Sequence, residues 1–350
     1  MNLRECPLIG ILVTRKQSRK KVLKLYQHYN NKRCKLYSFT PTDILWKEKR
    51  IIGLHLVGNK WKESTFPFPM VVYNRCYNKK VEAIKSLEST IGKSKCFNHI
   101  NHFNKWHLYN ILKNSNLDSN IPATFLSNEV NIRELLEKYR LLYCKPSYGH
   151  KGKGVYRLEL QKNGDIHISL YSILPAYICR NIEEIQPVID KLLGNSEYII
   201  QRGIQLNKLN SQYFDIRVLV QKDIKGQWAV TNMVSRIAYD LYYNTSMYET
   251  IYEASEVLQK LYSLDEKNGI LESLCELSIE IATTIELQTG LLGELGIDFG
   301  LDEEKKLWII EINGKPQKNI YQDLKGYRHK QLIYSRPVEY AYYLAQKSRG

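Results

Sequence analysis

The chain has 350 residues, 43% of them hydrophobic, which is too long for one small core and predicts two or three packed units. No stretch approaches the roughly 20 apolar residues of a membrane-spanning helix, and the apolar run at 8–13 is too short for a signal peptide, so we expect a soluble protein. The formal net charge of +15 favours an anionic partner such as a nucleotide, an acidic peptide or nucleic acid, unless it reflects a biased genome.

The seven cysteines include no CxxC pair, which argues against a disulfide framework or a zinc site and favours reduced thiols. His99, His102 and His107 lie close together but lack a metal-binding pattern, so surface or packing roles are favoured for them.

Residues 1–95 are expected to form a first, smaller α/β unit. Apolar patterning predicts a strand, a helix, a second strand and further β-structure, over 8–13, 18–29, 34–39 and 51–73. Arg75, Cys76 and Tyr77 cluster at the end of the last strand, but a lone cysteine there is more typical of packing than of a nucleophile. We interpret this unit as a platform or a substrate-selecting domain.

Residues 96–195 are expected to form a second unit. Asn104 can cap a helix over 104–113, which places Lys105 in the first turn, where a cation is unfavourable unless it serves a ligand. A solvated lysine is the alternative for Lys105. Further along, a charged helix is expected over 132–139.

The segment 141–156, LLYCKPSYGHKGKGVY, predicts two strands joined by a glycine-rich loop. Glycines let backbone amides approach a phosphate closely, and lysines beside them supply charge; these residues are Lys145, Gly149, Lys151, Gly152, Lys153 and Gly154. The loop is not a P-loop, because the GxxxxGK[ST] spacing is absent. A basic glycine hairpin without a ligand is the alternative.

Residues 196–350 are expected to form the third unit, with helices at 268–289 and 337–345. Strands are predicted over 197–204, 213–221 and 227–237, and alternation puts Asp215 and Arg217 on one face, toward which Arg236 is brought. Two arginines there could neutralise a transferring phosphate, or they could form salt bridges with Asp215 or a neighbouring acid. We favour the phosphate because of the surrounding motifs.

The stretch 293–316, GELGIDFGLDEEKKLWIIEINGKP, predicts a β-hairpin around which the chain is organised. A connection over 303–306 would place Asp298 opposite Glu311, with Asn313 on the same face and Ile310 and Ile312 on the other. Facing carboxylates tolerate each other best with a cation between them or a shared proton, and such hard oxygens suit Mg²⁺. A solvated hairpin face with aligned acids is the alternative.

These motifs, taken in order, resemble the ATP-grasp superfamily. The sequence is most similar to the YheC/YheD group of endospore coat-associated proteins of Firmicutes, in NKW, KPSYGHKGKGVY, FDIRVLVQ and LWIIEINGKPQ, over roughly 96–335. The resemblance implies an ATP-grasp fold, in which two α+β subdomains grip ATP, here preceded by the smaller N-terminal α/β domain. The segment after Asn313 lacks the glycine that often follows its proline, and the ribose-binding acid usual after the adenine strand is not obvious.

The resemblance also implies roles for individual residues. Lys105 and Lys145 would contact the α- and β-phosphates, and the 147–154 loop, including Ser147, would cover them. Gln201, Arg202, Gly203 and Ile204 would hold adenine and ribose. Arg217 and Arg236 would lie near the γ-phosphate and the acyl group, and Asp298, Glu311 and Asn313 would bind Mg²⁺.

The implied reaction transfers the γ-phosphoryl group to a substrate carboxylate, and an amine then attacks the acylphosphate. The substrates stay unidentified; a peptide or another acidic molecule would suit, and spore-coat proteins are candidate partners. The implied location is the mother-cell cytoplasm or the spore coat. Two alternatives remain open, a non-catalytic coat protein that keeps the nucleotide-binding fold and a small-molecule kinase on that fold. A nucleic-acid role rests on net charge alone and is disfavoured.

Overall fold

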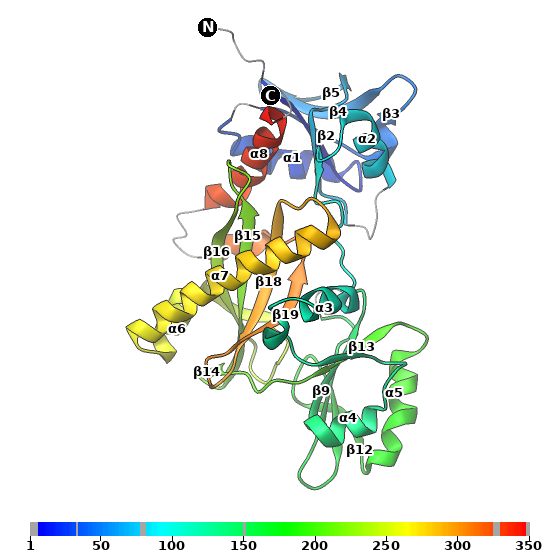
Figure 1. The fold of residues 1–350 in the computed structure, drawn as a ribbon, viewed down its shortest axis with the longest axis vertical. Helices are drawn as coiled ribbons and strands as arrows, with labels where there is room; N and C mark the ends of the chain where they lie inside the picture. Colours follow the sequence, from blue (N-terminus) through cyan, green and yellow to red (C-terminus); the bar gives the residue numbers. More distant parts are fainter. Residues whose placement is uncertain (1–5, 33, 78–81, 150–151, 325–329, 348–350) are drawn as a thin grey trace.

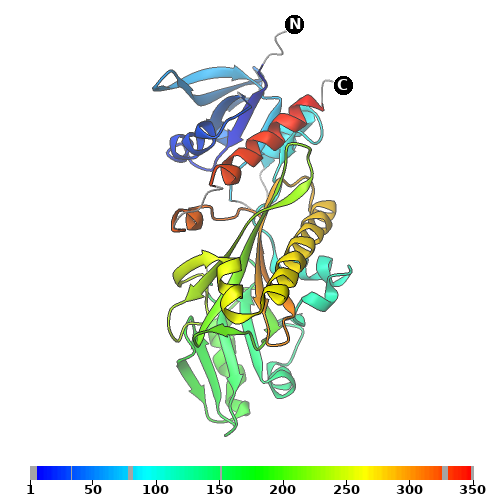
Figure 2. The same cartoon turned by 90° about the vertical axis from the view of Figure 1, so that its left-hand side faces the viewer.

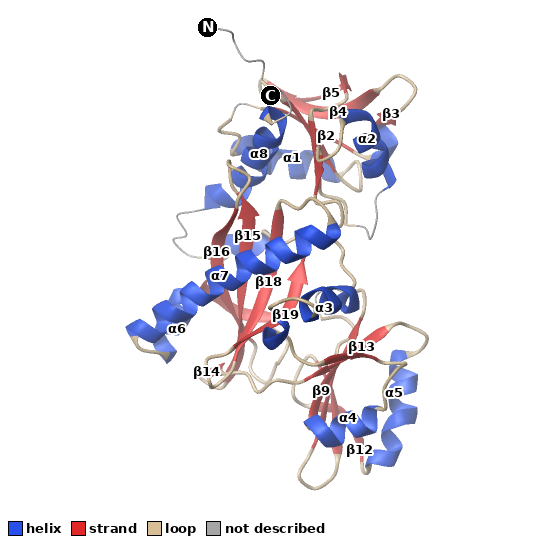
Figure 3. Cartoon of the chain, viewed as in Figure 1, coloured by secondary structure: helices blue, strands red, loops and turns tan. Residues whose placement is uncertain are grey.

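The computed structural model describes residues 6–32, 34–77, 82–149, 152–324 and 330–347. Within these ranges the chain forms three β-sheets, one of seven strands and two of six. The sheets follow one another along the long axis of the molecule, with the third sheet between the first and the second (Figure 1). Helices lie beside all three sheets, so the chain is of the mixed α+β class (Figure 3).

The first sheet has the order β3-β4-β2-β1-β6-β7, with β5 paired to β4. Strand β1 is an apolar run that is buried almost throughout, and it pairs in parallel with β2 and β6. Helices α1 and α2 connect the parallel strands, as such crossovers require. The bounds are β1 Leu8–Leu12, α1 Ser18–His28, β2 Lys35–Phe39, β3 Ile44–Leu45, β4 Arg50–Val57, β5 Lys60–Pro67, β6 Val71–Asn74, α2 Glu82–Ile91 and β7 Cys96–Phe97.

The second sheet is antiparallel, in the order β12-β11-β10-β9-β13-β8, and helices α4 and α5 pack on one of its faces. Strand β13 lies beyond position 195 in the chain, yet it pairs with β9 and β8 of this sheet. The bounds are β8 Thr124–Leu126, α4 Ile132–Tyr139, β9 Leu141–Pro146, β10 Tyr156–Leu160, β11 Ile166–Leu170, β12 Pro175–Cys179, α5 Ile185–Leu193 and β13 Tyr198–Arg202.

The third sheet has the order β17-β16-β15-β18-β19, with β14 paired to β15. Its core face is covered by α6 and α7, and α3 joins that core through Leu108 and Leu112. A capping box between Ser263 and Glu266 starts α7, and Gly290 follows its last residue with a φ of +93°. The bounds are α3 Lys105–Lys113, β14 Lys208–Leu209, β15 Gln212–Lys222, β16 Trp228–Ala238, β17 Tyr248–Glu253, α6 Ala254–Leu261, α7 Leu264–Thr289, β18 Glu294–Leu301 and β19 Leu307–Asn313.

The last helix, α8, spans Lys330–Gln346 and therefore begins before the predicted start at 337. Pro337 is typical of a first helical turn, but here it lies inside the helix. Packing decides the boundary, because Ile333 and Tyr334 enter a core shared by the first sheet and β15. None of the helices in the described ranges is both long enough and apolar enough to cross a bilayer.

Candidate ATP and metal site

The hairpin of β18 and β19 places Asp298 directly opposite Glu311, so the predicted pairing is confirmed. The route to it differs from the prediction, because Leu301 rather than Asp302 faces Leu307. A β-bulge beyond Asp298 adds one residue to β19 and restores the register.

The same bulge corrects the expectation that Ile310 points away from the acids. Ile310 lines the cleft together with Glu311, whereas Ile309 and Ile312 belong to the hydrophobic core. The extra residue on β19 breaks strict alternation, so two neighbours reach the cleft side.

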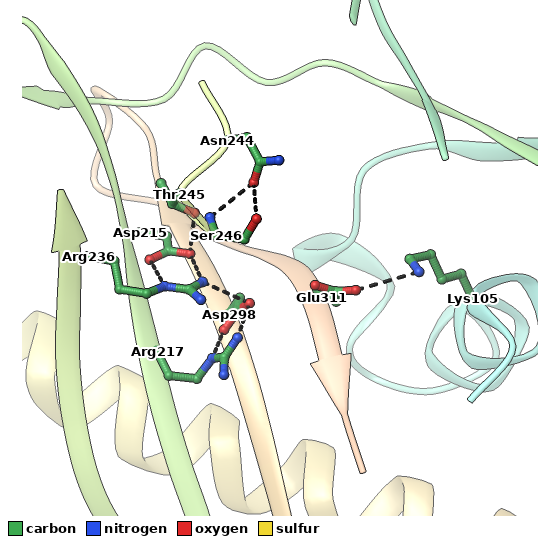
Figure 4. A network of polar contacts seen from close by, with 9 residues as sticks. All are labelled: Lys105, Asp215, Arg217, Arg236, Asn244, Thr245, Ser246, Asp298 and Glu311. Atoms are coloured by element: carbon green, nitrogen blue, oxygen red, sulfur yellow. Dashed lines mark hydrogen bonds and ion pairs between the residues drawn. The ribbon is translucent and has the colours of Figure 1, made fainter. Parts of the chain in front are cut away.

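A row of charged side chains crosses four strands of the third sheet (Figure 4). The direct pairs are Asp215 with Arg236, Arg217 with Asp298, and Asp298 with Glu311. Arg217 donates through Nε and Nη2 to the two Asp298 oxygens, with 2.6 Å from Nη2 to Oδ2. Arg236 donates to both Asp215 oxygens and, over 3.0 Å, to Asp298 Oδ2. The salt-bridged arrangement of the arginines is thus the one present in this structure.

This arrangement changes the argument from repulsion between the acids. Burial alone would raise the pKa of Asp298, but Arg217 and Arg236 outweigh it and hold that pKa below its usual value. The arginines supply the positive charge that aligned carboxylates need. Alignment of Asp298 and Glu311 therefore does not by itself demand a metal ion.

The donor chemistry nevertheless fits Mg²⁺. Glu311 and Asn313, two residues apart on β19, line one cavity and offer a carboxylate and an amide oxygen. Asp298 can add a ligand through Oδ1, which accepts from one arginine and keeps a second lone pair, whereas Oδ2 accepts from both arginines. In the described ranges no cluster of three or more His, Cys, Asp or Glu side chains could hold a metal, so a site here needs the Asn313 amide or oxygens from a substrate.

Lys105 is the first residue of α3, as predicted, and Asn104 caps the helix by accepting from the His107 amide. The Lys105 ammonium lies 3.5 Å from Glu311 Oε1 and 3.4 Å from the Gly149 carbonyl. It is therefore not a solvated lysine, because it joins the glycine loop to the acid hairpin.

Lys145, on β9, donates to Gln201 Oε1 over 2.6 Å. Burial lowers the pKa of Lys145 to about 8; Glu311 and Asp298 oppose this, while Lys105 adds to it. A partly buried cation without a bonded carboxylate is costly, and a phosphate is a group that would satisfy it.

The glycine loop covers this region and touches the third unit. Gly152 has a φ of +65°, and a Cβ there would lie 1.9 Å from Asn244 Nδ2. Gly154 has a φ of +71°, and a Cβ there would lie 2.9 Å from the Tyr198 hydroxyl oxygen. Both positions demand glycine. Ser147 is buried, with no hydrogen-bond partner for Oγ among the described residues, while Lys151 falls outside the described ranges.

The strand end at 201–204 forms one wall of a cleft with about 930 Å³ of empty space open to solvent. The Arg202 and Gly203 amides already donate to the Ala123 and Leu141 carbonyls, so these two N–H groups are not available to a base. The cleft brings together most of the predicted nucleotide and metal residues: Lys105, Lys145, Gly149, Gly152, Lys153, Gln201, Arg202, Ile204, Arg236, Asp298 and Glu311. Ser147, Gly154, Gly203, Arg217 and Asn313 do not line it, although Arg217 contacts Asp298 and Asn313 lines the adjoining cavity.

Several cleft residues were not predicted. Leu206 and Tyr143 add apolar surface beside Ile310, and the loop 244–246 closes one side. Thr245 donates through its hydroxyl to Asp215 Oδ2 over 2.6 Å, which ties that loop to the charged row. Alternation along β9 puts Tyr143 and Lys145 on one face and could have identified Tyr143, but the approach of 244–246 is a long-range contact without a local signal.

Comparisons with known proteins agree with this geometry. Residues 93–344 match the family model described as YheC/D-like ATP-grasp. The chain is 27% identical over 333 residues to the endospore coat-associated protein YheD of Bacillus subtilis strain 168, covering 89% of this chain and 71% of that protein.

Solved structures show the same fold at low identity. A D-alanine–D-alanine ligase from Bacillus anthracis in complex with ATP has a TM-score of 0.55 and 13% identity, with 98% of each chain covered. The ATP-grasp ligase PsnB, in complex with the precursor peptide PsnA2 and AMPPNP, has a TM-score of 0.52 and 12% identity, with 95% of this chain and 97% of PsnB covered. The fold expected from the sequence is thereby confirmed.

Proposed function

This chain belongs to the YheC/D-like ATP-grasp family, as its motifs indicate, and we propose that it is an ATP- and Mg²⁺-dependent ligase that joins a carboxylate to an amine. The observation that carries the proposal is the cleft in which Lys105 and Lys145 from the second unit face Glu311 and the charged row of the third. Cations on one wall and hard oxygens on the other are what a metal-bound triphosphate requires.

Different cleft residues would bind different parts of the metal-bound nucleotide. Lys105, Lys145 and Lys153 would neutralise phosphate oxygens, and the glycine loop would bring backbone amides close to them. Ile204, Leu206 and Ile310 supply apolar surface for a base. Glu311, Asn313 and Asp298 would hold Mg²⁺, which would neutralise charge on the phosphates.

The chemistry then needs positioning rather than a nucleophile from the chain. A substrate carboxylate oxygen attacks the γ-phosphorus, the bond to the β,γ-bridging oxygen breaks, and ADP leaves. An amine attacks the carbonyl carbon of the resulting acylphosphate, and inorganic phosphate departs as the amine loses a proton. Arg236, which lines the cleft, and Arg217, which contacts Asp298, would stabilise the transferring charge once their carboxylate contacts loosen.

Calorimetric titration with a non-hydrolysable ATP analogue, with and without Mg²⁺, tests the site. The Glu311→Gln variant keeps the shape of the side chain but removes a ligand charge, so we expect it to lose most of the Mg²⁺-dependent gain in affinity. Glu303→Gln, in the connection between β18 and β19, is the matched control and should bind as the parent does.

The outcomes separate the alternatives. Unchanged Mg²⁺-dependent binding in Glu311→Gln would remove Glu311 from the metal site. ATP turnover that requires both an acid and an amine would support the ligase, whereas phosphorylation of a hydroxyl would indicate a kinase. No nucleotide binding in any condition would leave a non-catalytic role, and a coat function like the one named for YheD would then lead.

A further inference from the structure

The positive charge of this protein is concentrated in one part of the chain. Residues 1–100 contain 21 Lys and Arg against 6 Asp and Glu, which accounts for the whole net charge of +15. The other 250 residues contain 30 of each kind. A biased genome would enrich lysine along the entire chain, so composition bias does not explain a charge confined to the first unit.

Within that unit the most basic stretch surrounds α1. Residues 6–42 contain nine Lys and Arg and no acid. Lys20, Lys21 and Lys24 are exposed on α1, and Lys20 and Lys24 are four residues apart, so these like charges repel each other. The ion pairs of this stretch use Lys16 and Arg19, which contact Asp43, and Arg19 also contacts Glu63. Arg15 and the three exposed lysines form no ion pair with a described residue.

The basic stretch passes, at Thr14, beside the cavity that adjoins the cleft. Thr14 Oγ1 accepts a hydrogen bond of 3.4 Å from the Tyr77 amide, and Tyr77 lines the same cavity as Glu311 and Asn313. In Figure 2, α1 is the dark blue helix at the edge of the first unit, below the light blue β4–β5 hairpin.

The topology of the first sheet explains this placement. Strand β1 lies between β2 and β6, and the chain leaves β1 toward β2 but leaves β6 toward β7. The carboxyl ends of two strands whose connections diverge leave a crevice, which is where open α/β sheets bind ligands. Arg15 and Lys16 follow one of these ends, and Arg75 follows the other.

We propose that Arg15, Lys16, Lys20, Lys21 and Lys24, called here the α1 basic surface, dock an acidic segment of a polypeptide that supplies the carboxylate to the cleft. The inference rests on the proposed function, because it identifies the class of substrate for that reaction. Aspartate and glutamate side chains bind lysine and arginine through charge-assisted hydrogen bonds. Several acidic side chains of one polypeptide can bind along α1. A further carboxylate of the same polypeptide can then reach Tyr77 and the cavity that it lines.

Nucleic acid is the competing polyanion. A polypeptide is favoured because the cleft consumes a carboxylate, which an acidic peptide carries and a nucleic acid does not. Single-stranded nucleic acids also depend on exposed aromatic rings for stacking. The α1 helix has one tyrosine, Tyr26, which is buried, and Tyr29, just after the helix, is half-buried against Tyr334.

Fluorescence anisotropy of the full chain with a labelled oligoglutamate tests the surface. The variant K20Q/K21Q/K24Q should weaken binding about tenfold at low salt, because three exposed ion pairs contribute two- to threefold each. The control K47Q/K49Q/K60Q removes the same charge from exposed positions near the β3–β4 and β4–β5 turns and should leave the affinity nearly unchanged. Oligoglutamine serves as the uncharged control ligand, and an oligonucleotide with the same net charge as the oligoglutamate serves as the competing polyanion. Thermal melting checks that each variant folds.

The outcomes test the docking surface independently of the proposed ligase function. Oligoglutamate binding that falls in the first variant but not in the control, with unchanged ADP affinity, supports the docking surface. Equal loss in both variants, or no loss in either, would overturn it, as would tighter binding of the oligonucleotide through the same lysines. If the protein binds no nucleotide but oligoglutamate affinity still falls only in K20Q/K21Q/K24Q, the docking surface is supported and the proposed ligase function is refuted.

Discussion

Lys145 gives a test in which stability and nucleotide binding respond to pH in opposite directions. Burial holds its pKa at about 8 in the folded chain, against 10.5 for the free group. The folded pKa is the lower one, so the fold disfavours the charged lysine; this cost is fully present below about pH 8 and disappears as the pH rises toward 10.5. At about 1.4 kcal/mol per pKa unit, the cost near pH 7 is about 3 kcal/mol.

Replacing Lys145 with methionine removes the charge and keeps the length of the side chain. The variant also leaves Gln201 Oε1 without its 2.6 Å donor, which costs roughly 1–2 kcal/mol. We therefore expect Lys145→Met to be more stable than the parent by about 1–2 kcal/mol at pH 7, and less stable by a similar amount near pH 10.5. Urea denaturation of both proteins between pH 7 and 10.5 measures where the difference in their free energies of unfolding changes sign. The contributions of other titrating groups are common to both proteins and cancel in this difference.

Nucleotide affinity should fall over the same range, because only charged Lys145 attracts phosphate. With a pKa of about 8, the parent should bind ADP about tenfold more weakly at pH 9 than at pH 7, where the phosphates are already almost fully ionised. Lys145→Met should bind ADP weakly at every pH in this interval. A variant that is destabilised at pH 7, or parent affinity that does not change with pH, would refute a buried, phosphate-binding cation at this position.

Two further substitutions test other parts of the structure. Gly152→Ala meets both a left-handed φ and Asn244, so it should weaken nucleotide binding measured by calorimetry, whereas Gly164→Ala, with a φ of +92° and open space, should only cost roughly 1–2 kcal/mol of stability. Glu294→Gln leaves the buried Lys318 and Arg75 without their carboxylate, at 2.6 and 2.9 Å, and should lower the free energy of unfolding by roughly 3–5 kcal/mol at pH 7. Because the pKa of Glu294 is held at about 2, this stabilisation should be present above about pH 4.5 and fade as the pH falls toward 2, which urea denaturation of parent and variant can follow.

Local signals in the sequence predicted individual elements well. The Asn104 cap placed Lys105 at the start of α3, and the charged segment Ile132–Tyr139 is a helix with the predicted bounds. The pairing of Asp298 with Glu311 was also predicted. The connection between the strands is one residue longer than predicted, and the bulge on β19 offsets this shift in register. Patterns within about ten residues carry this information, because caps and alternation act at that range.

Contacts between distant residues were not predictable in the same way. Nothing local shows that Arg217 pairs with Asp298, 81 residues away, or that Asn244 meets the glycine loop. The membership of β13 in the second sheet follows from its pairing with β9, which periodicity does not encode. The partners of the arginines therefore had to come from the structure, and they decide how much charge the cleft offers a nucleotide.

Asp298 controls that charge and yields a last prediction. Within the charged row, the buried residues Arg217, Arg236, Asp215 and Asp298 together carry no net charge, so phosphate attraction rests on the lysines while Asp298 holds both arginines. Asp298→Asn keeps an acceptor for Arg217, and Arg236 keeps Asp215, but the row gains one positive charge.

ADP affinity without Mg²⁺ should then rise by on the order of 1 kcal/mol, about fivefold. The gain in affinity on adding Mg²⁺ should shrink, because the metal site loses a ligand charge. Asp302→Asn, which changes a buried acid on the same hairpin bonded to Trp308, is the control and should alter neither quantity. Unchanged Mg²⁺-free binding in Asp298→Asn would show that the nucleotide does not reach these arginines, and weaker binding would contradict the charge argument.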